Sequence, residues 1–455
     1  MNRLDAAYSL TIGPHYLWHR LATGKYGPKT REKTGRVPNR VKTSATAVMG
    51  ADDPHRETPC LWLHAVSVGE VIAAADLARM FAEDNPRWET RYSVTTATGR
   101  GVAERQWGAD NVFYYPLDFS SMVGRAFDNI RPSLIVLMEL EIWPNFLAEA
   151  ARRRIPVVVA NARITERSVK RLSWAPGVTR SMVRAVEAWF AQTEEYARRL
   201  ERIGVPPARI EVTGSVKYDA VPPELDVELG AYYRRLFGCG VVPYCEGGDL
   251  LVVAGSTHPG EETILLEALK RVRSEGRPKP RLVVAPRHPE RLDEVEAIAS
   301  GYGKVARRSA LAEPGPEEEK AAVDADVILV DTMGELSKIY AAADVVFTGG
   351  SLVRHGGQNF LEPCGLAKPT LVGPHLWNFR EAAELLEGES CLRVVRHPEE
   401  LAGAFGEMFA RPDAAAGMGE RARRILLERR GAARRMADRL GIIARMIAGS
   451  GGKRS

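Results

Sequence analysis

Residues 61–97, LWLHAVSVGEVIAAADLARMFAEDNPRWETRYSVTTA, contain the pattern that decides the fold. An apolar run at 61–67 is followed by a helical segment at 71–83 and then by a second apolar run at 92–97. The runs are continuously apolar rather than alternating, which is typical of strands buried on both faces of a parallel sheet. The stretch therefore predicts a β-α-β unit.

The same unit recurs on both sides of a Pro/Gly-rich stretch at 218–248. Further strands are predicted at 112–116, 134–138, 156–160, 188–192 and 210–213, and then at 250–254, 281–285, 327–330, 345–348, 370–372 and 392–395. The sequence thus predicts two doubly wound α/β domains. The expected parts are a basic arm (1–43), a first domain (44–217), a linker with a short helix at 229–236 (218–248), a second domain (249–398) and a helical tail (399–455).

Charge is concentrated at the two ends of the chain. The net formal charge is +5, with +7 in residues 1–43, +8 in residues 418–455 and −10 between them. A nucleic-acid binder would place basic charge along a central groove, so that class is disfavoured. Basic ends suit contact with an anionic membrane surface. No stretch is long and apolar enough for a membrane-spanning helix, and the five Cys form no CxxC pair.

Familiar cofactor motifs are missing from the sequence. Neither GxGxxG, GxxxxGK[ST] nor HExxH occurs, which disfavours dinucleotide, P-loop and zinc-protease chemistry, and no cofactor or metal is expected. The fold class alone leaves dehydrogenases, epimerases and glycosyltransferases open.

The entry of the first predicted helix carries an acidic residue, Glu70, shortly after Ser67 and Gly69. Because it follows the carboxyl end of a strand, the carboxylate is placed to take a proton from an acceptor hydroxyl. It could equally complement the helix dipole, and spacing alone leaves both interpretations open.

Charged residues also follow later strands of the first domain. Glu139 and Glu141 come after the strand at 134–138, and Lys217 comes after the last strand before the linker. A helix cap or a structural salt bridge is the alternative role for each.

The second domain shows features typical of phosphate binding at successive strand ends. Small and hydroxyl residues end its first strand, Arg287 ends the next, and glycines precede a helix start near Asn359. The candidates are Ser256, Thr257, His258, Pro286, Arg287, His288, Met333, Gly334, Glu335, Ser351, Asn359, Phe360, Leu361 and Glu362.

Ten motifs in order resemble those of bacterial 3-deoxy-D-manno-octulosonic acid (Kdo) transferases specific for lipid A. They span residues 60–390 and include HAVSVGE, ELEIWPN, NARITERS, TGSVKYD, AGSTHPGEE, APRHPER, FTGGSL, GGQNFLEP and VGPHLWNF. The resemblance implies a GT-B fold, in which two Rossmann-like domains face a cleft. It also implies a metal-independent, inverting transfer of Kdo from CMP-Kdo to a lipid A precursor at the cytoplasmic face of the inner membrane.

The resemblance also implies roles for individual residues. Glu70 corresponds to the general base, Glu139, rather than Glu141, to a second essential carboxylate, and Lys217 to a group that stabilises the transition state. CMP would be held by Pro286 with Arg287, by Met333–Glu335 and by Asn359–Glu362.

Two departures from the family pattern stand out. Gln358 replaces a His found in many members, and Gly13-Pro14 interrupts the usual apolar N-terminal segment. The alternative functions are a GT-B enzyme with a UDP-sugar donor, either a transferase or an epimerase, and a nucleotide-sugar-binding protein without turnover.

Overall fold

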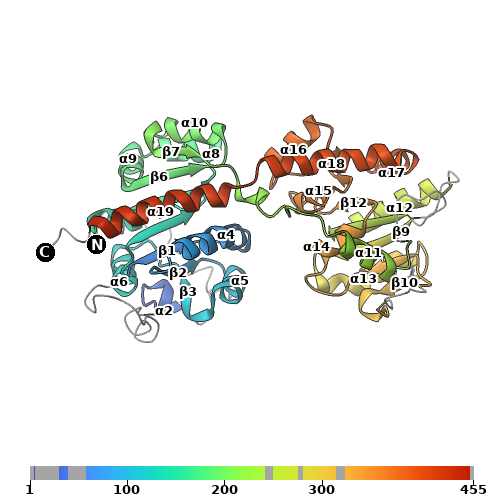
Figure 1. Cartoon of the computed structure of the whole chain (residues 1–455), viewed down its shortest axis with the longest axis horizontal. Coiled ribbons are helices and arrows are strands. Elements are labelled where there is room, and N and C mark those ends of the chain that lie inside the picture. Colours follow the sequence, from blue (N-terminus) through green and yellow to red (C-terminus); the bar gives the residue numbers. More distant parts are fainter. Residues whose placement is uncertain are drawn as a thin grey trace. The chain divides into compact units, whose positions relative to one another are not determined.

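The computed structural model describes residue 5 and residues 30–38, 58–240, 250–274, 280–313 and 323–450. The chain divides into two compact units. The first comprises residues 1–217 and 431–455, and the second comprises residues 218–430. Each unit contains one seven-stranded sheet in which every strand pair is parallel, as the continuous apolar runs predicted (Figure 1).

The sheet of the first unit has the strand order β3-β2-β1-β4-β5-β6-β7. Its strands are β1 Cys60–His64, β2 Glu89–Val94, β3 Val112–Tyr114, β4 Leu134–Met138, β5 Val157–Ala162, β6 Val186–Ala191 and β7 Ile210–Val212. Its helices are α2 Thr30–Lys33, α4 Val68–Asp84, α5 Ala97–Trp107, α6 Ser120–Ile130, α7 Pro144–Arg152, α8 Glu166–Ser173, α9 Pro176–Ala185, α10 Glu194–Arg202 and α19 Ala432–Ser450.

Both faces of this sheet are covered by helices. Trp62 packs on one face among aromatic side chains of α6 and α7, and its neighbours Leu61 and Leu63 pack on the other face with α4. Successive strand residues point to opposite faces, so each needs an apolar side chain. This is why the strand sequences do not alternate.

The sheet of the second unit has the order β10-β11-β9-β8-β12-β13-β14. Its strands are β8 Leu251–Thr257, β9 Arg281–Pro286, β10 Val305–Arg307, β11 Val327–Leu329, β12 Val345–Thr348, β13 Thr370–Val372 and β14 Arg393–Val394. Its helices are α11 Val227–Leu236, α12 Glu261–Ser274, α13 Leu292–Ser300, α14 Leu336–Ile339, α15 Leu361–Gly365, α16 Arg380–Gly388, α17 Pro398–Ala410 and α18 Pro412–Glu428.

The expected linker differs from the structure. The described part of 218–248 belongs to the second unit, where Tyr233 and Leu236 of α11 pack into its core. Arg234 of the same helix is 2% exposed and forms an ion pair with the fully buried Asp344 at 2.9 Å. The Pro and Gly residues suggested a spacer between domains. Instead, α11 packs its apolar side chains into the core of the second unit and pairs Arg234 with Asp344.

The expected helical tail is also divided differently. It forms three helices, of which α17 and α18 pack in the second unit. The last helix, α19, lies alongside α4 of the first unit and inserts Met436 and Leu440 into its core (Figure 1). Pro412 begins α18 and separates it from α17. Gly431, with φ of +93°, separates α18 from α19.

The basic arm lies largely outside the described residues. Asp5 is described, and its carboxylate accepts hydrogen bonds from Ser120 N at 2.9 Å and from Asn145 Nδ2 at 3.2 Å. Among the described helices, none combines the length and the apolarity required to cross a bilayer.

Candidate active site

The entry of α4 holds Glu70 in a fixed position. Ser67 is the N-cap residue and its hydroxyl accepts a hydrogen bond from Glu70 N at 3.5 Å. In return, the Glu70 carboxylate accepts bonds from Val66 N at 2.9 Å and from Ser67 Oγ at 3.2 Å. This reciprocal arrangement resembles a capping box. Both interpretations of Glu70 therefore remain compatible, because the side chain that caps the helix also lies at the carboxyl end of β1.

Burial raises the pKa of Glu70 to about 7. The hydrogen bond from Val66 N opposes this shift, and the negative charges of Glu139 and Glu141 add to it. A carboxyl group with a pKa near neutrality is a stronger proton acceptor than an ordinary one while still being substantially ionised. Glu70 is thus able to accept a proton near neutral pH.

Glu139 and Glu141 reach this group because β4 pairs directly with β1. Glu141 is held by a hydrogen bond from Trp143 Nε1 at 3.0 Å, and burial raises its pKa, whereas that bond lowers it. The Glu139 carboxylate has no side-chain hydrogen bond or ion pair to another residue in the described part of the chain. Of the two, Glu139 is the carboxylate left available to a ligand.

Lys217 lies in a turn that is hydrogen-bonded to a central strand of the sheet. The turn, Val216–Tyr218, is a single 3-10 helix, and Val216 N donates to Asn161 Oδ1 at 3.3 Å. Asn161 stands near the carboxyl end of β5, and β5 is the parallel neighbour of β4. Lys217 therefore lies at the carboxyl ends of the strands, as Glu139 does. Asn161 begins the NARITERS motif, but its contact with Val216 joins residues 55 positions apart, which the motif alone does not reveal.

Unusual backbone conformations mark three strand ends. Glu139, Asn161 and Ser256 have φ of +57°, +53° and +54°, values that non-glycine residues rarely adopt. Such strain persists only where the surrounding structure imposes it, and it is enriched at functional sites. Glu139 follows β4, and the other two stand within the final residues of β5 and β8.

In the second unit, four of the predicted donor residues line one pocket of about 160 Å³. They are Pro286, Arg287, Met333 and Gly334, and Ser256 joins them. Arg287 is exposed, and its guanidinium has no hydrogen bond or ion pair to another residue that the structure describes. An unpaired guanidinium at the mouth of a small pocket is suited to binding phosphate.

Glu335 stabilises the loop beside this pocket. Its carboxylate accepts hydrogen bonds from Thr332 Oγ1, from Tyr233 OH at 3.2 Å and from Arg308 Nη2 at 3.2 Å. Burial would raise the pKa of Glu335, but these donors outweigh it and the pKa is lowered. Glu335 is therefore ionised at neutral pH, with both oxygens already bonded.

The Asn359–Glu362 segment exposes little of its side chains. Phe360 is 0% and Leu361 is 3% exposed, and both pack in a core cluster. Asn359 Nδ2 donates to Glu362 Oε1 at 2.9 Å, and burial raises the pKa of Glu362, which that bond opposes. Phe360 and Leu361 can therefore offer a ligand only their backbone groups.

The hydroxyl groups of two candidate residues point into the protein. The Thr257 hydroxyl donates to Glu262 Oε1 at 2.8 Å, and the Ser351 hydroxyl donates to Thr348 O at 2.6 Å and accepts from Gly373 N at 2.8 Å. Both residues are 0% exposed. Both hydroxyls are therefore bonded to buried groups of their own unit, and the approach of an oxyanion to the backbone at these strand ends remains a prediction.

The backbone amides of the glycine-rich loop after β12 (349–352) also bind a buried group of the second unit. The Glu261 carboxylate accepts hydrogen bonds from Gly350 N at 2.7 Å, Ser351 N at 3.0 Å and Leu352 N at 2.9 Å, and also from His258 N at 2.9 Å. These amides resemble an anion-binding loop, but their anion is an internal side chain.

His258 lies at the centre of a cluster of imidazole rings. It stacks on His355 with ring centroids 4.1 Å apart, and the His288 ring is 5.5 Å away. Burial lowers the pKa of His258 to about 4, and the neighbouring His355, His288 and Arg287 contribute. Gln358 Nε2 lies 3.1 Å from His258 Nε2, so the amide donates to a neutral ring.

Two parallel doubly wound units, each with polar groups at the carboxyl ends of its strands, define a GT-B fold. The fold is similar to a glycosyltransferase from Rickettsia africae, at 11% identity, 88% of this chain, 100% of that chain and a TM-score of 0.54. It is also similar to MurG from Acinetobacter baumannii, at 13% identity, 84% of this chain, 99% of that chain and a TM-score of 0.51.

Sequence comparison identifies the family. Residues 30–220 match the family described as 3-Deoxy-D-manno-octulosonic-acid transferase (kdotransferase). The 3-deoxy-D-manno-octulosonic acid transferase of Bordetella pertussis is 34% identical, over 86% of this chain and 89% of its own length. The enzyme of that name from Haemophilus influenzae is 32% identical, over 84% of this chain and 86% of its own length. The chain belongs to the family of 3-deoxy-D-manno-octulosonic acid transferases.

Proposed function

We propose that this chain transfers Kdo from CMP-Kdo to a lipid A precursor in lipopolysaccharide biosynthesis, with inversion and with Glu70 as general base. The observation that carries the proposal is the Glu70 carboxyl group, fixed by Val66 and Ser67 and with a pKa raised to about 7. Family membership supports the Kdo donor, and the chemistry of the two units supports the division of roles.

Acceptor activation is assigned to the first unit. Glu70 takes a proton from an acceptor hydroxyl, and the hydroxyl oxygen then attacks the anomeric carbon of Kdo. The negative charge of Glu139 increases the basicity of Glu70. Lys217, at the same edge of the sheet, stabilises the negative charge that develops in the transition state.

Donor binding is assigned to the second unit. Arg287 binds the CMP phosphate in the pocket that Pro286, Met333 and Gly334 also line. Its positive charge stabilises the phosphate as the bond to Kdo breaks and CMP departs. Asn359–Glu362 contributes backbone groups, and Glu335 keeps the neighbouring loop in place.

The proposed location is the cytoplasmic face of the inner membrane, as a peripheral protein. Support comes from the basic charge in residues 1–43 and 418–455 and from the lipid nature of the proposed acceptor. Salt should weaken this association, because exposed charges are screened by ions.

The direct test is incubation with CMP-Kdo and a lipid A precursor, followed by mass spectrometry of the product. Glu70→Gln should abolish most transfer while CMP binding, measured by calorimetry, survives. Glu201→Gln is the matched control, because Glu201 is exposed on α10. Preference for UDP over CMP would favour the UDP-sugar alternative, and full activity of Glu70→Gln would exclude the proposed base.

A further inference from the structure

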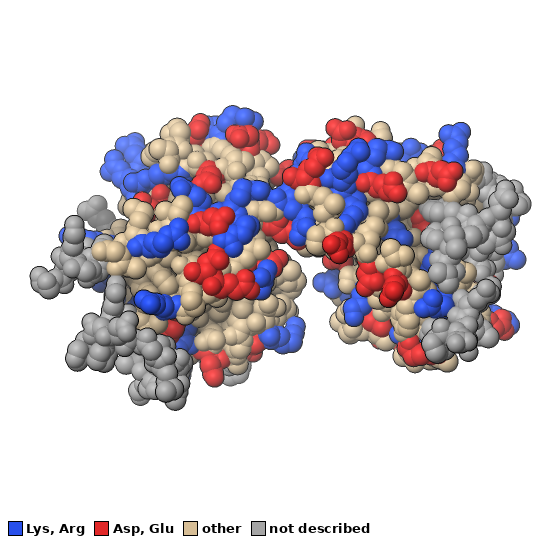
Figure 2. All heavy atoms as spheres, in the orientation of Figure 1, with Lys and Arg blue, Asp and Glu red and all other residues tan. Residues whose placement is uncertain are grey.

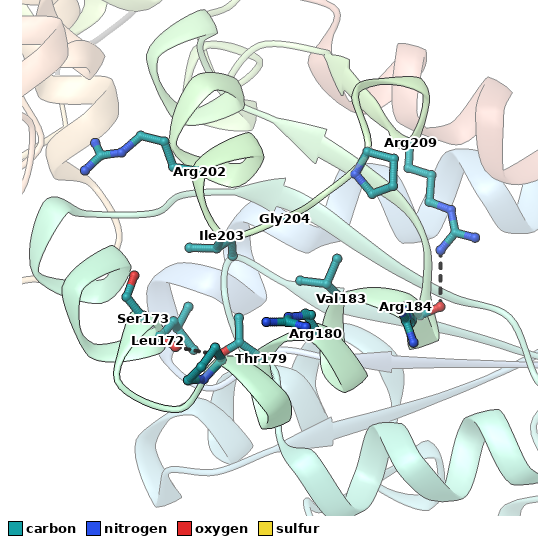
Figure 3. Close-up of a pocket in the computed structure, with 12 residues that line it drawn as sticks. Leu172, Ser173, Thr179, Arg180, Val183, Arg184, Arg202, Ile203, Gly204 and Arg209 are labelled. Atoms are coloured by element: carbon teal, nitrogen blue, oxygen red, sulfur yellow. Dashed lines mark hydrogen bonds between the residues drawn. The ribbon is translucent and has the colours of Figure 1, made fainter.

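A pocket of about 480 Å³ lies in the first unit among α8, α9, α10 and the segment before β7. It is distinct from the groups assigned above, since none of them lines it. Figure 3 shows Val183 and Ile203 at its floor and arginine side chains around it.

Two of its four arginines are available to a ligand. Arg202 forms an ion pair with Glu166 at 2.6 Å, and Arg209 Nη1 donates to Arg184 O at 3.2 Å and to Val186 O at 3.0 Å. Arg180 and Arg184 are exposed, and neither guanidinium has a hydrogen bond or ion pair within the described ranges. The pocket therefore presents uncompensated positive charge above an apolar floor.

The pocket lies at the amino ends of the strands, whereas Glu70 lies at their carboxyl ends. Arg184 lies two residues before β6, and Arg209 directly precedes β7, so both stand at the amino ends of parallel strands. Glu70 and Glu139 follow the carboxyl ends of β1 and β4. A ligand here would not occupy the proposed transfer site.

An exposed tryptophan adjoins the pocket. Trp174 is 89% exposed and stands between the lining residues Ser173 and Pro176. Figure 2 shows Lys and Arg side chains over α9, whereas basic and acidic side chains are mixed over α10. Trp next to basic residues is typical of protein surfaces that contact the interface between lipid headgroups and acyl chains.

We propose that this pocket binds the phosphate of an anionic phospholipid headgroup, with Arg180 and Arg184 paired to the phosphate and Trp174 inserted at the lipid interface. The apolar floor accommodates the glycerol region. The inference rests on the membrane association proposed above and adds a defined headgroup site to it.

The test is sedimentation of the full chain with phosphatidylcholine vesicles, with and without phosphatidylglycerol. Arg180→Gln/Arg184→Gln should bind phosphatidylglycerol vesicles at least about tenfold more weakly, since each basic residue near an anionic surface contributes to binding. Arg87→Gln/Arg105→Gln removes the same charge at exposed positions outside the pocket, and its binding should change less than about threefold.

Each outcome separates the possibilities. If the unmodified chain ignores phosphatidylglycerol vesicles, the membrane association and the pocket assignment both fail, whereas transfer to a dispersed acceptor could still succeed. If the chain binds but both double variants lose affinity equally, only the pocket assignment fails. If Arg180→Gln/Arg184→Gln abolishes the binding of inorganic phosphate, measured by calorimetry without vesicles, but leaves the binding of phosphatidylglycerol vesicles unchanged, the pocket is a site for soluble anions and the lipid assignment is wrong.

A second measurement does not depend on the arginine variants. Trp174→Ala should reduce the quenching of tryptophan fluorescence by brominated phosphatidylglycerol vesicles, because the inserted ring is the one closest to the bromine atoms. Unchanged quenching would overturn the placement of Trp174 at the lipid interface.

Discussion

Glu70→Gln should stabilise the first unit above pH 7. The pKa of Glu70 is raised from 4.5 to about 7, chiefly by burial, so ionising this carboxyl group costs free energy in the folded state but not in the unfolded chain. The folded state binds the proton more tightly, and stability therefore falls as pH rises from 4.5 towards 7. At pH 8 the cost is about 3 kcal/mol, since one pKa unit corresponds to about 1.4 kcal/mol.

The neutral amide should remove most of this cost without losing its contacts. In the Glu70→Gln variant the side-chain oxygen can still accept from Val66 N, and the amide nitrogen can donate to Ser67 Oγ, as the geometry of the carboxylate allows. At pH 5 the native carboxyl is largely protonated, so the gain should fall below about 1 kcal/mol. Stabilisation that depends on pH in this way is the signature of an active-site carboxyl group that is kept basic although this destabilises the fold.

Urea unfolding followed by tryptophan fluorescence measures this effect. Six of the eight Trp lie between residues 58 and 217, so the signal reports mainly on the first unit. The exposed control Glu201→Gln should change stability by less than about 0.5 kcal/mol at either pH. Equal or lower stability of Glu70→Gln at pH 8, or a gain that is the same at pH 5, would refute the raised pKa.

Three further predictions concern the pH dependence of transfer, the donor site and a buried ion pair. For a base with a pKa of about 7, kcat/KM for transfer should rise about tenfold between pH 6 and pH 8, as the ionised fraction of Glu70 increases; a flat profile would contradict its role. Arg287→Ala should weaken CMP binding by calorimetry about 10–100-fold with unchanged Tm, since the exposed guanidinium supports no other described residue; unaltered affinity would remove Arg287 from the donor site. Arg234→Met should destabilise the second unit by about 3–5 kcal/mol in urea, because it removes the guanidinium that forms an ion pair with the buried Asp344 carboxylate; a change under about 1 kcal/mol would show that the pair contributes little.

The predicted fold is confirmed in its main features. Continuous apolar runs located thirteen of the fourteen strands, and 134–138, 345–348 and 370–372 match β4, β12 and β13 to the residue. The missed strand is β10, Val305–Arg307, at the edge of its sheet and half-buried throughout. An edge strand needs less apolar surface, so its sequence lacks the run that identifies the others.

The candidate site is harder to predict because strand ends resemble each other in sequence. Thr257 and Ser351 stand in motifs that suit phosphate binding, yet Glu262 and the backbone of β12 use their hydroxyls. Whether a polar group serves a ligand or a buried partner depends on residues far away in the sequence. The assignments of Glu70, Arg287 and Lys217 remain predictions that the proposed experiments address.

The sequence by itself determined two parallel α/β domains, since a strand buried on both faces must be apolar throughout, and it placed polar residues at the strand ends. Only the tertiary structure decided that α11 and α19 pack into separate cores and that Glu139 and Glu141 raise the pKa of Glu70. It also decided that the Glu261 carboxylate binds the amides of the glycine-rich loop. The physical reason is that burial, electrostatic coupling and long-range hydrogen bonds arise from pairs of residues that the chain brings together only when it folds.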